Sequence, residues 1–325
     1  MNRHRRQVLR LLAGAATLPA GSRVVAAPAY PSRAVRIVVG YAAGGSSDIG
    51  ARLIAQSLQE RLGQPFIVEN RPGAATNLAT EMVVRAPPDG YTLLIVAPSS
   101  AINATLYDKL SFVFLRDIAP VASIFRQPQV MLAGPSLAAR TVAELITEAK
   151  ANPGKITIAS AGTGSVGHLA GEMFKMMTGV SMVHVPYRGA GPALTDLLGG
   201  QVQTAITGMT GAIEHVRSGK LRALAVTTAM RADALPDVPA MGEVVPGYEA
   251  GDMLGLCAPK NTPAEVVERL NREINAGLAD PTLQARFAAL GGAALALSPA
   301  EYGKLLADET EKWGKVIRAA NIRAE

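Results

Sequence analysis

Two glycine-rich stretches carry the residues whose types and spacing are best suited to chemistry. Residues 41–48 read YAAGGSSD and residues 161–168 read AGTGSVGH. Each stretch follows a short apolar run and precedes an amphipathic segment, which is the pattern of a strand, a loop and the start of a helix. Glycine lets the backbone approach a ligand closely, and the free N–H groups of a helix's first turn favour an anion. Both stretches therefore predict binding of a carboxylate or a phosphate.

The second stretch also matches a dinucleotide-binding fingerprint, with Gly162, Gly164 and Gly167 in the required spacing. That fingerprint needs an acidic residue at the end of the next strand, and the following apolar run, SMVHVPYRG, contains none. A Walker-type phosphate loop ends in Gly-Lys-Ser/Thr, and neither stretch does. We therefore predict no nucleotide cofactor.

Hydrolytic or oxidoreductase chemistry stays open as an alternative through Ser165 and His168, which lie three residues apart at the start of a predicted helix. Thr163 stands where the nucleophile-elbow pattern needs glycine, and no third residue is evident to orient the histidine. His184 and His215 lack the i, i+4 partners or cysteine neighbours of a metal site, so no metal is predicted. His168 itself is explained equally well by helix-end structure and by ligand contact.

The elements that must position these residues alternate between apolar strands and helices of ten to fifteen residues. Strand-like segments are AVRIVVG, YTLLIVAP, KITIASAG and VQTAITG. This alternation predicts parallel sheets with helices on both faces. About nine strands are many for one such sheet, so we expect two α/β lobes. The last strand, GLCAP, and the three helices after it are expected to return to the first lobe, and the single Cys257 is expected to be a buried core residue.

The first 29 residues have the organisation of a secretory signal peptide. An arginine-rich start is followed by the apolar run VLRLLAGAATLPAG and by a small-x-small site, Ala27 to Ala29. Arg5-Arg6 also resembles a twin-arginine export signal, and a short amphipathic helix is the alternative. These residues hold five arginines and no acid, so without them the formal charge of +6 falls to +1. The basic composition is therefore no indication of a nucleic-acid partner.

Five longer motifs resemble the substrate-binding receptors of tripartite tricarboxylate transporters, often called the Bug family. They are VVGYAAGGSSDIGARLIAQSL, VENRPGAATNLATEMVVRAPPDGYTLL, SAGTGSVGHLAGEMF, VPYRGAGPALTDLLGGQV and LRALAVTTAMRADALPDVPAMGEVVPGYEA. The resemblance implies an α/β, two-lobed periplasmic-binding-protein fold, type II-like or Venus flytrap. Each lobe would be a mainly parallel sheet flanked by helices, with the ligand cleft between lobes. We expect residues 1–29 as signal peptide, 30–130 plus 252–325 as lobe 1, and 131–251 as lobe 2.

The same resemblance implies how the ligand is held, namely by backbone N–H groups, small hydroxyls and ordered water. On that basis the ligand-binding residues are Tyr41, Ala43, Gly44, Gly45, Ser46, Ser47, Asp48, Ser99, Thr163, Ser165 and His168. The sequence departs from the family at Met253, where relatives usually have tryptophan, and at Thr207, where an acid is frequent. Both departures bear on the identity of the ligand.

The sequence thus predicts a periplasmic, monomeric receptor without catalytic activity. It would capture a small organic acid, such as a di- or tricarboxylate, for the membrane subunits of a tripartite tricarboxylate-type transporter or for a sensor kinase. An exported enzyme using Ser165 and His168 is the alternative, and an adhesin-like or scaffold role is a third possibility.

Overall fold

The computed structural model describes residues 30–324. The predicted signal peptide, residues 1–29, lies outside the described residues. By its internal contacts the chain divides into residues 1–32 and residues 33–325. All the helices and strands named below belong to the second unit.

Three parallel strands form the first part of the sheet. They are β1 (Val35–Val39), β2 (Phe66–Asn70) and β3 (Thr92–Val96), with β1 between the other two. β1 and β3 are nearly continuous apolar runs, as is typical of parallel strands covered on both faces. The helical segments that follow these strands are α2 (Ser46–Leu62), η1 (Ala74–Thr76), α3 (Asn77–Val84) and α4 (Pro98–Leu106). The predicted strand, glycine loop and helix of residues 35–62 are confirmed.

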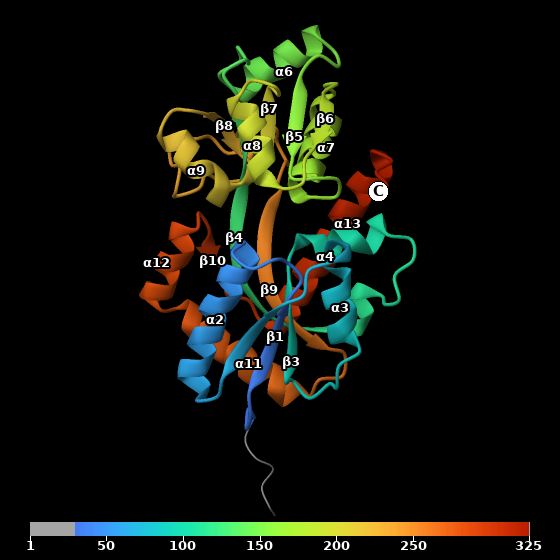
Figure 1. Cartoon of the computed structure of the whole chain (residues 1–325), viewed down its shortest axis with the longest axis vertical. Coiled ribbons are helices and arrows are strands. Elements are labelled where there is room, and N and C mark those ends of the chain that lie inside the picture. Colours follow the sequence, from blue (N-terminus) through green and yellow to red (C-terminus); the bar gives the residue numbers. More distant parts are fainter. Residues whose placement is uncertain (1–29, 325) are drawn as a thin grey trace, which may run out of the picture. The chain divides into compact units, whose positions relative to one another are not determined.

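A second set of parallel strands comprises β5 (Thr157–Ser160), β6 (Val183–Pro186) and β7 (Thr204–Gly208), with β5 in the middle. Each is followed by a helix, as Figure 1 shows: α7 (Val166–Thr178), α8 (Ala190–Leu198) and α9 (Met209–Arg217). α6 (Val142–Ala151) precedes β5, and β8 (Arg222–Val226) follows α9. The alternation read from the sequence is therefore present in both parts of the sheet.

Two antiparallel strands join the two sets. β4 (Ile118–Ala133) pairs with β9 (Gly251–Pro259) as far as Pro128, and from Gln129 onward it pairs with β7 and β8. The resulting order is β2-β1-β3-β9-β4-β7-β5-β6. The α/β fold is confirmed, and its sheet is mixed because these two crossing strands run against their neighbours. Local alternation of strands and helices could not reveal that feature, since strand direction depends on long-range pairing.

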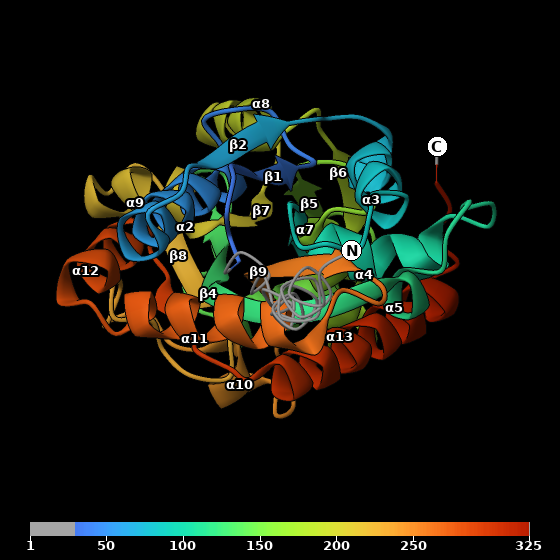
Figure 2. The same cartoon turned by 90° about the horizontal axis from the view of Figure 1, so that it is seen from below.

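The remaining elements are α5 (Phe114–Asp117), α10 (Met241–Val244), α11 (Ala264–Leu278), α12 (Pro281–Ala289), β10 (Ala293–Ala294) and α13 (Pro299–Ala319). α11 packs against α2 and β4, and it lies beside α13 in Figure 2. α13 runs along α4 and β4, and its last turns place Trp313 in the same buried cluster as Leu169 and Phe174 of α7. α11 and α13 thus pack against β4 and the helices α2 and α4, and α13 also reaches the core that includes α7.

Cys257 on β9 is fully buried in the cluster that includes Val38, Leu94 and Tyr302. Burial raises the pKa of its thiol well above the ordinary range, which keeps it protonated and unreactive. The expectation of a structural cysteine is confirmed.

Candidate functional site

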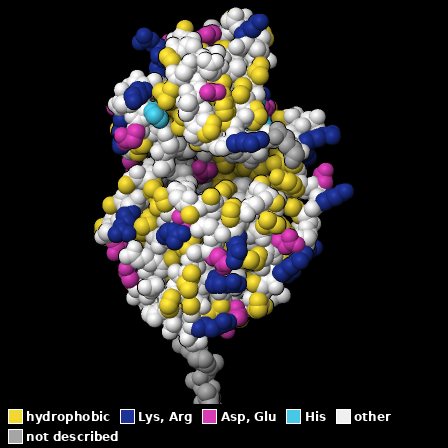
Figure 3. All heavy atoms as spheres, viewed as in Figure 1, with side chains coloured by type: hydrophobic (Ala, Val, Ile, Leu, Met, Phe, Trp, Pro, Cys, Tyr) yellow, Lys and Arg dark blue, Asp and Glu magenta, His cyan; other side chains and the backbone are white. Residues whose placement is uncertain are grey.

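A cavity of about 690 Å³ opens between the two sets of strands, and the space-filling view shows the surface hollowed across its middle (Figure 3). Helix N-termini converge on it. Ser46 and Ser47 begin α2, Ser99 lies in the first turn of α4, and Val166, Ala190 and Thr210 stand in the first turns of α7, α8 and α9. Each helix directs the positive end of its dipole and its unpaired first-turn N–H groups toward this space. The cavity therefore favours negative charge without a basic side chain.

The start of α2, like those of α4, α8 and α9, has no side-chain hydrogen bond at its N-cap. Its N-cap residue, Gly45, provides no side chain, and no other side chain caps the helix. Gly44 has a φ of +88°, a left-handed conformation that glycine adopts without strain. The N–H groups of Ser46 and Ser47 thus belong to an uncapped first turn that lines the cavity.

Asp48 stabilises this loop from behind and does not line the cavity. Its carboxylate accepts hydrogen bonds from the backbone N–H of Gly44 (2.9 Å), from Arg52 (3.0 Å) and from Asn70 (3.0 Å). The residue is 3% exposed. Burial by itself would raise the pKa of this carboxyl, but the bonds from Arg52, Gly44 and Asn70 outweigh burial and hold the pKa below 3.8. Asp48 therefore stays ionised and fixes the loop geometry.

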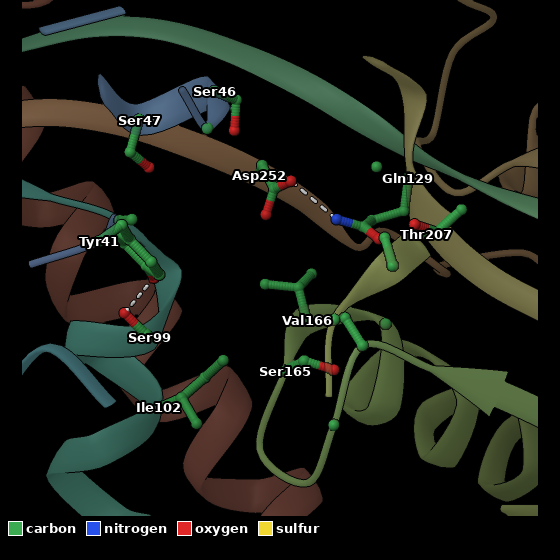
Figure 4. A pocket seen from close by; sticks show the side chains of 18 of the residues that line it. Tyr41, Ser46, Ser47, Ser99, Ile102, Gln129, Ser165, Val166, Thr207 and Asp252 are labelled. Carbon is green, nitrogen blue, oxygen red and sulfur yellow. Dashed lines mark hydrogen bonds between the residues drawn. The ribbon is translucent and has the colours of Figure 1, made fainter. Parts of the chain in front are cut away.

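Tyr41 and Ser99 close one wall of the cavity. Their hydroxyls are 2.6 Å apart (Figure 4). Ser99 Oγ also lies 3.3 Å from the hydroxyl of Thr76. Asn70 donates to the backbone carbonyl of Tyr41 (3.0 Å), which ties this wall to β2. Burial raises the pKa of Tyr41 to about 12, so its hydroxyl remains a neutral donor. The wall offers hydroxyl groups held in place by each other.

The second glycine-rich loop is closed by its own hydrogen bonds. Ser165 caps α7 by accepting from the backbone N–H of His168 (3.2 Å), and the ring Nδ1 of His168 accepts from the backbone N–H of Gly164 (3.1 Å). Ser165 Oγ and the ring are thus each bonded to backbone, which is not the nucleophile–base bond that catalysis needs. Burial lowers the pKa of His168 to about 4, with a smaller contribution from the positive charge of Lys175, so the ring is neutral.

His168 lies behind this loop and does not line the cavity. Its ring stacks on His184 with centroids 3.8 Å apart, and His184 Nε2 lies 2.7 Å from Ser160 Oγ. Glu172 is 3.7 Å from His168 Nε2, but Lys175 engages that carboxylate at 2.6 Å. Both histidines therefore serve the packing of α7 on β5 and β6.

The structure brings most of the predicted site residues to the cavity wall. Those that line it are Tyr41, Gly44, Gly45, Ser46, Ser47, Ser99, Thr163 and Ser165. Asp48 and His168 support the two loops from behind, and Ala43 is exposed outside the cavity. Met253 and Thr207, the two departures from the family pattern, also line the wall.

Sequence reasoning missed a polar group at the middle of the cavity. Asp252 of β9 accepts hydrogen bonds from the side-chain amides of Gln127 (3.1 Å) and Gln129 (2.7 Å), both on β4. Among the lining residues that the structure describes, Asp252 is the one with a formal charge. Two glutamines two positions apart in an apolar strand share one face of the sheet, and that spacing was the available signal.

Comparison with known proteins identifies the fold and the family. An R. palustris protein with adipate superposes with a TM-score of 0.80 at 36% identity, over 90% of this chain and 99% of its own. MatC from Rhodopseudomonas palustris with bound malate has a TM-score of 0.76 at 31% identity, over 89% of this chain and 100% of its own. Protein BugT of Bordetella pertussis is 37% identical over 302 residues, which cover 92% of this chain and 93% of BugT.

Fold and cavity together are those of a two-lobed, periplasmic-type solute-binding protein. Residues 50–322 match the tripartite tricarboxylate transporter family receptor, TctC. The chain belongs to this family. The predicted family, fold class and solute-binding function are therefore confirmed. Within residues 30–324, no helix combines the length and apolar character needed to cross a membrane.

Proposed function

We propose that this chain is an extracytoplasmic receptor that captures a small carboxylate and does not transform it. The observation that carries the proposal is the convergence of helix N-termini on a cavity without a lysine or arginine among its described lining residues. Backbone N–H groups and helix dipoles bind carboxylates in such settings. The relatives with adipate and with malate support the same ligand class.

We propose that the ligand contacts Tyr41, Gly44, Gly45, Ser46, Ser47, Ser99, Thr163 and Ser165. Closure of residues 30–130 plus 252–325 on residues 131–251 would bring the two glycine-rich loops onto one ligand. The change of β4 partners between Pro128 and Gln129 supports a boundary there. Contacts made to both lobes only in the closed state would supply the free energy of closure.

A panel of mono-, di- and tricarboxylates, with the matching amides as uncharged controls, tests the ligand class by thermal shift. Ligand at about a hundred times its dissociation constant stabilises the folded state by roughly 2.7 kcal/mol. With an unfolding entropy of roughly 0.6 kcal/mol/K for a chain of this size, the melting temperature rises by about 4 °C. No shift and no calorimetric heat with any carboxylate would exclude the proposal.

Replacing Ser46 with proline removes its backbone donor together with its hydroxyl, so Ser46→Ala, which removes the hydroxyl alone, is the reference for the backbone donor. Proline is well tolerated at the first position of a helix, and it removes the Ser46 N–H. The preceding Gly45, at φ −80° and ψ 168°, has the extended conformation that a following proline requires. Ala264→Pro, at the first position of α11 and away from the cavity, is the matched control. We expect weaker carboxylate binding in Ser46→Pro than in Ser46→Ala or Ala264→Pro; equal affinity in Ser46→Pro and Ser46→Ala would rule out this N–H as a donor.

We further propose export to the periplasm with cleavage near Ala29 and action as a monomer that serves a tripartite tricarboxylate-type transporter or a sensor kinase. The family's role supports export and transport. N-terminal sequencing of periplasmic material, expected to begin at Tyr30, tests the cleavage site. Light scattering tests the oligomeric state, and uptake of the bound acid in a deletion strain separates transport from sensing.

A further inference from the structure

Asp252 is the feature of the cavity that a receptor for simple carboxylates does not explain. It projects from β9 between the two glycine-rich loops, and both glutamine amides donate to the same oxygen, Oδ2. Gln127 stands directly opposite Asp252 on the paired strand β4, which holds the carboxylate in one orientation. In Figure 4 the other carboxylate oxygen points into the cavity, toward the space between Tyr41 and Val166. That oxygen receives neither glutamine bond.

The charge of this carboxylate limits what binds beside it. Helix N-termini favour negative charge in the cavity, and Asp252 adds a negative group wherever its carboxyl is ionised. Burial raises the pKa of its carboxyl above 3.8, and the bonds from Gln127 and Gln129 offset part of that effect. A plain dicarboxylate would place further negative charge near a group that is already costly to ionise. None of the described lining residues is a lysine, arginine or histidine that would neutralise it.

A ligand with both a carboxylate and an ammonium group resolves this conflict. Its carboxylate would meet the loop N–H groups and hydroxyls, and its ammonium would donate to the cavity-facing oxygen of Asp252. An ion pair in a desolvated site is favourable when both charges are also hydrogen-bonded, and Gln127 and Gln129 supply those bonds to Asp252. The cavity of about 690 Å³ accommodates ligands of this size.

We propose that Asp252 is a specificity-determining residue that accepts a hydrogen bond from the ligand's ammonium group, so that the ligand is an amino-substituted carboxylate. Gln127 and Gln129 act as positioning residues for Asp252. This inference rests on the proposed carboxylate-binding function and specifies its ligand.

Three pairs of ligands, each differing by one ammonium group, test the assignment: succinate and aspartate, glutarate and glutamate, adipate and 2-aminoadipate. Calorimetry on the wild-type protein is expected to give at least tenfold tighter binding for the amino-substituted member of at least one pair. This comparison needs no variant. Asp252→Asn preserves the shape and removes the charge, and it is expected to abolish or reverse the preference. Asp233→Asn, which removes the same charge from an exposed position, is expected to keep it.

The outcomes separate the inference from the proposed function. If the plain dicarboxylates bind at least as tightly as their amino counterparts, the Asp252 assignment is wrong while carboxylate binding stands. The assignment is also wrong if Asp252→Asn weakens both members of a pair equally. If malate and aspartate bind with equal affinity and Asp252→Asn weakens both equally, Asp252 accepts from a ligand hydroxyl as well as from an ammonium group. That result would overturn the proposed selection for ammonium. If no member of any pair binds, the Asp252 assignment fails, and the proposed carboxylate function fails with it only if the mono- and tricarboxylates of the thermal-shift panel also give no shift.

Discussion

Replacing Gly167 with alanine tests how closely α7 must approach β7 for the cavity to form. Gly167 lies in the first turn of α7 and lines the cavity. A Cβ at this position would be 2.3 Å from the carbonyl oxygen of Ile206 and 3.2 Å from its carbonyl carbon. The neighbour is the backbone of a buried strand, so it cannot rotate away. Reaching ordinary contact, beginning near 3.4 Å, requires the start of α7 to move by about 1 Å.

Overpacking of this kind costs about 1–3 kcal/mol of folding free energy. With an unfolding entropy of roughly 0.6 kcal/mol/K, the melting temperature falls by about 2–5 °C. The same displacement moves the 162–165 loop relative to β7. Loss of one hydrogen bond to a charged ligand, about 1.5–3 kcal/mol, then weakens carboxylate binding by roughly tenfold or more.

Gly171→Ala is the matched control, because it makes the same substitution one turn later in α7. There the added Cβ would be 3.1 Å from Cδ1 of Ile158, the tip of a side chain that can shift. Calorimetric melting and ligand titration of both variants give the comparison. The steric argument is refuted if Gly167→Ala has the melting temperature of the wild type and binds ligand with unchanged affinity. It is also refuted if both variants lose stability equally.

Two further predictions concern titratable groups behind the loops. His168→Asn keeps an acceptor for the Gly164 N–H but cannot titrate. The pKa of His168 is lowered from 6.5 to about 4, so the wild type should lose up to about 3 kcal/mol of stability as pH falls from 6.5 to 4. The variant should show a flatter dependence of its unfolding free energy on pH, measured by denaturant unfolding. The charged or titratable groups next to His168 are Glu172, Lys175 and His184. If the variant's stability falls with pH as steeply as that of the wild type, the pH dependence does not come from His168. Asp48→Asn should cost about 1–3 kcal/mol at neutral pH, from weakened bonds to a charged acceptor. Since the pKa of Asp48 lies below 3.8, this stabilisation is present above that pH and is lost as pH falls through the lowered pKa. The unfolding free energies of wild type and variant should therefore converge in acid. A difference between them that stays constant down to the lowest pH would disprove this prediction.

The two glycine-rich loops were predictable because their signals are local. A left-handed turn needs glycine at positions such as Gly44 and Gly164, and the apolar strand before each loop and the amphipathic helix after it are adjacent in sequence. Motif resemblance added Ser99 and Thr163, which also line the cavity. It did not distinguish residues that face the cavity from Asp48 and His168, which support the loops from behind. Both kinds of residue are needed for the same loop, and a motif includes them alike.

What the sequence determined by itself is the succession of strands and helices, the two anion-favouring loops and the family. Only the tertiary structure decided the centre of the cavity. Gln127 and Asp252 are 125 positions apart and meet because β4 and β9 pair antiparallel in one particular register. A shift of that register by one residue would turn these side chains to the other face of the sheet. Long-range strand pairing is set by the packing of the whole core, so the spacing of Gln127 and Gln129 could mark a polar face of β4 but could not show that Asp252 lies against it.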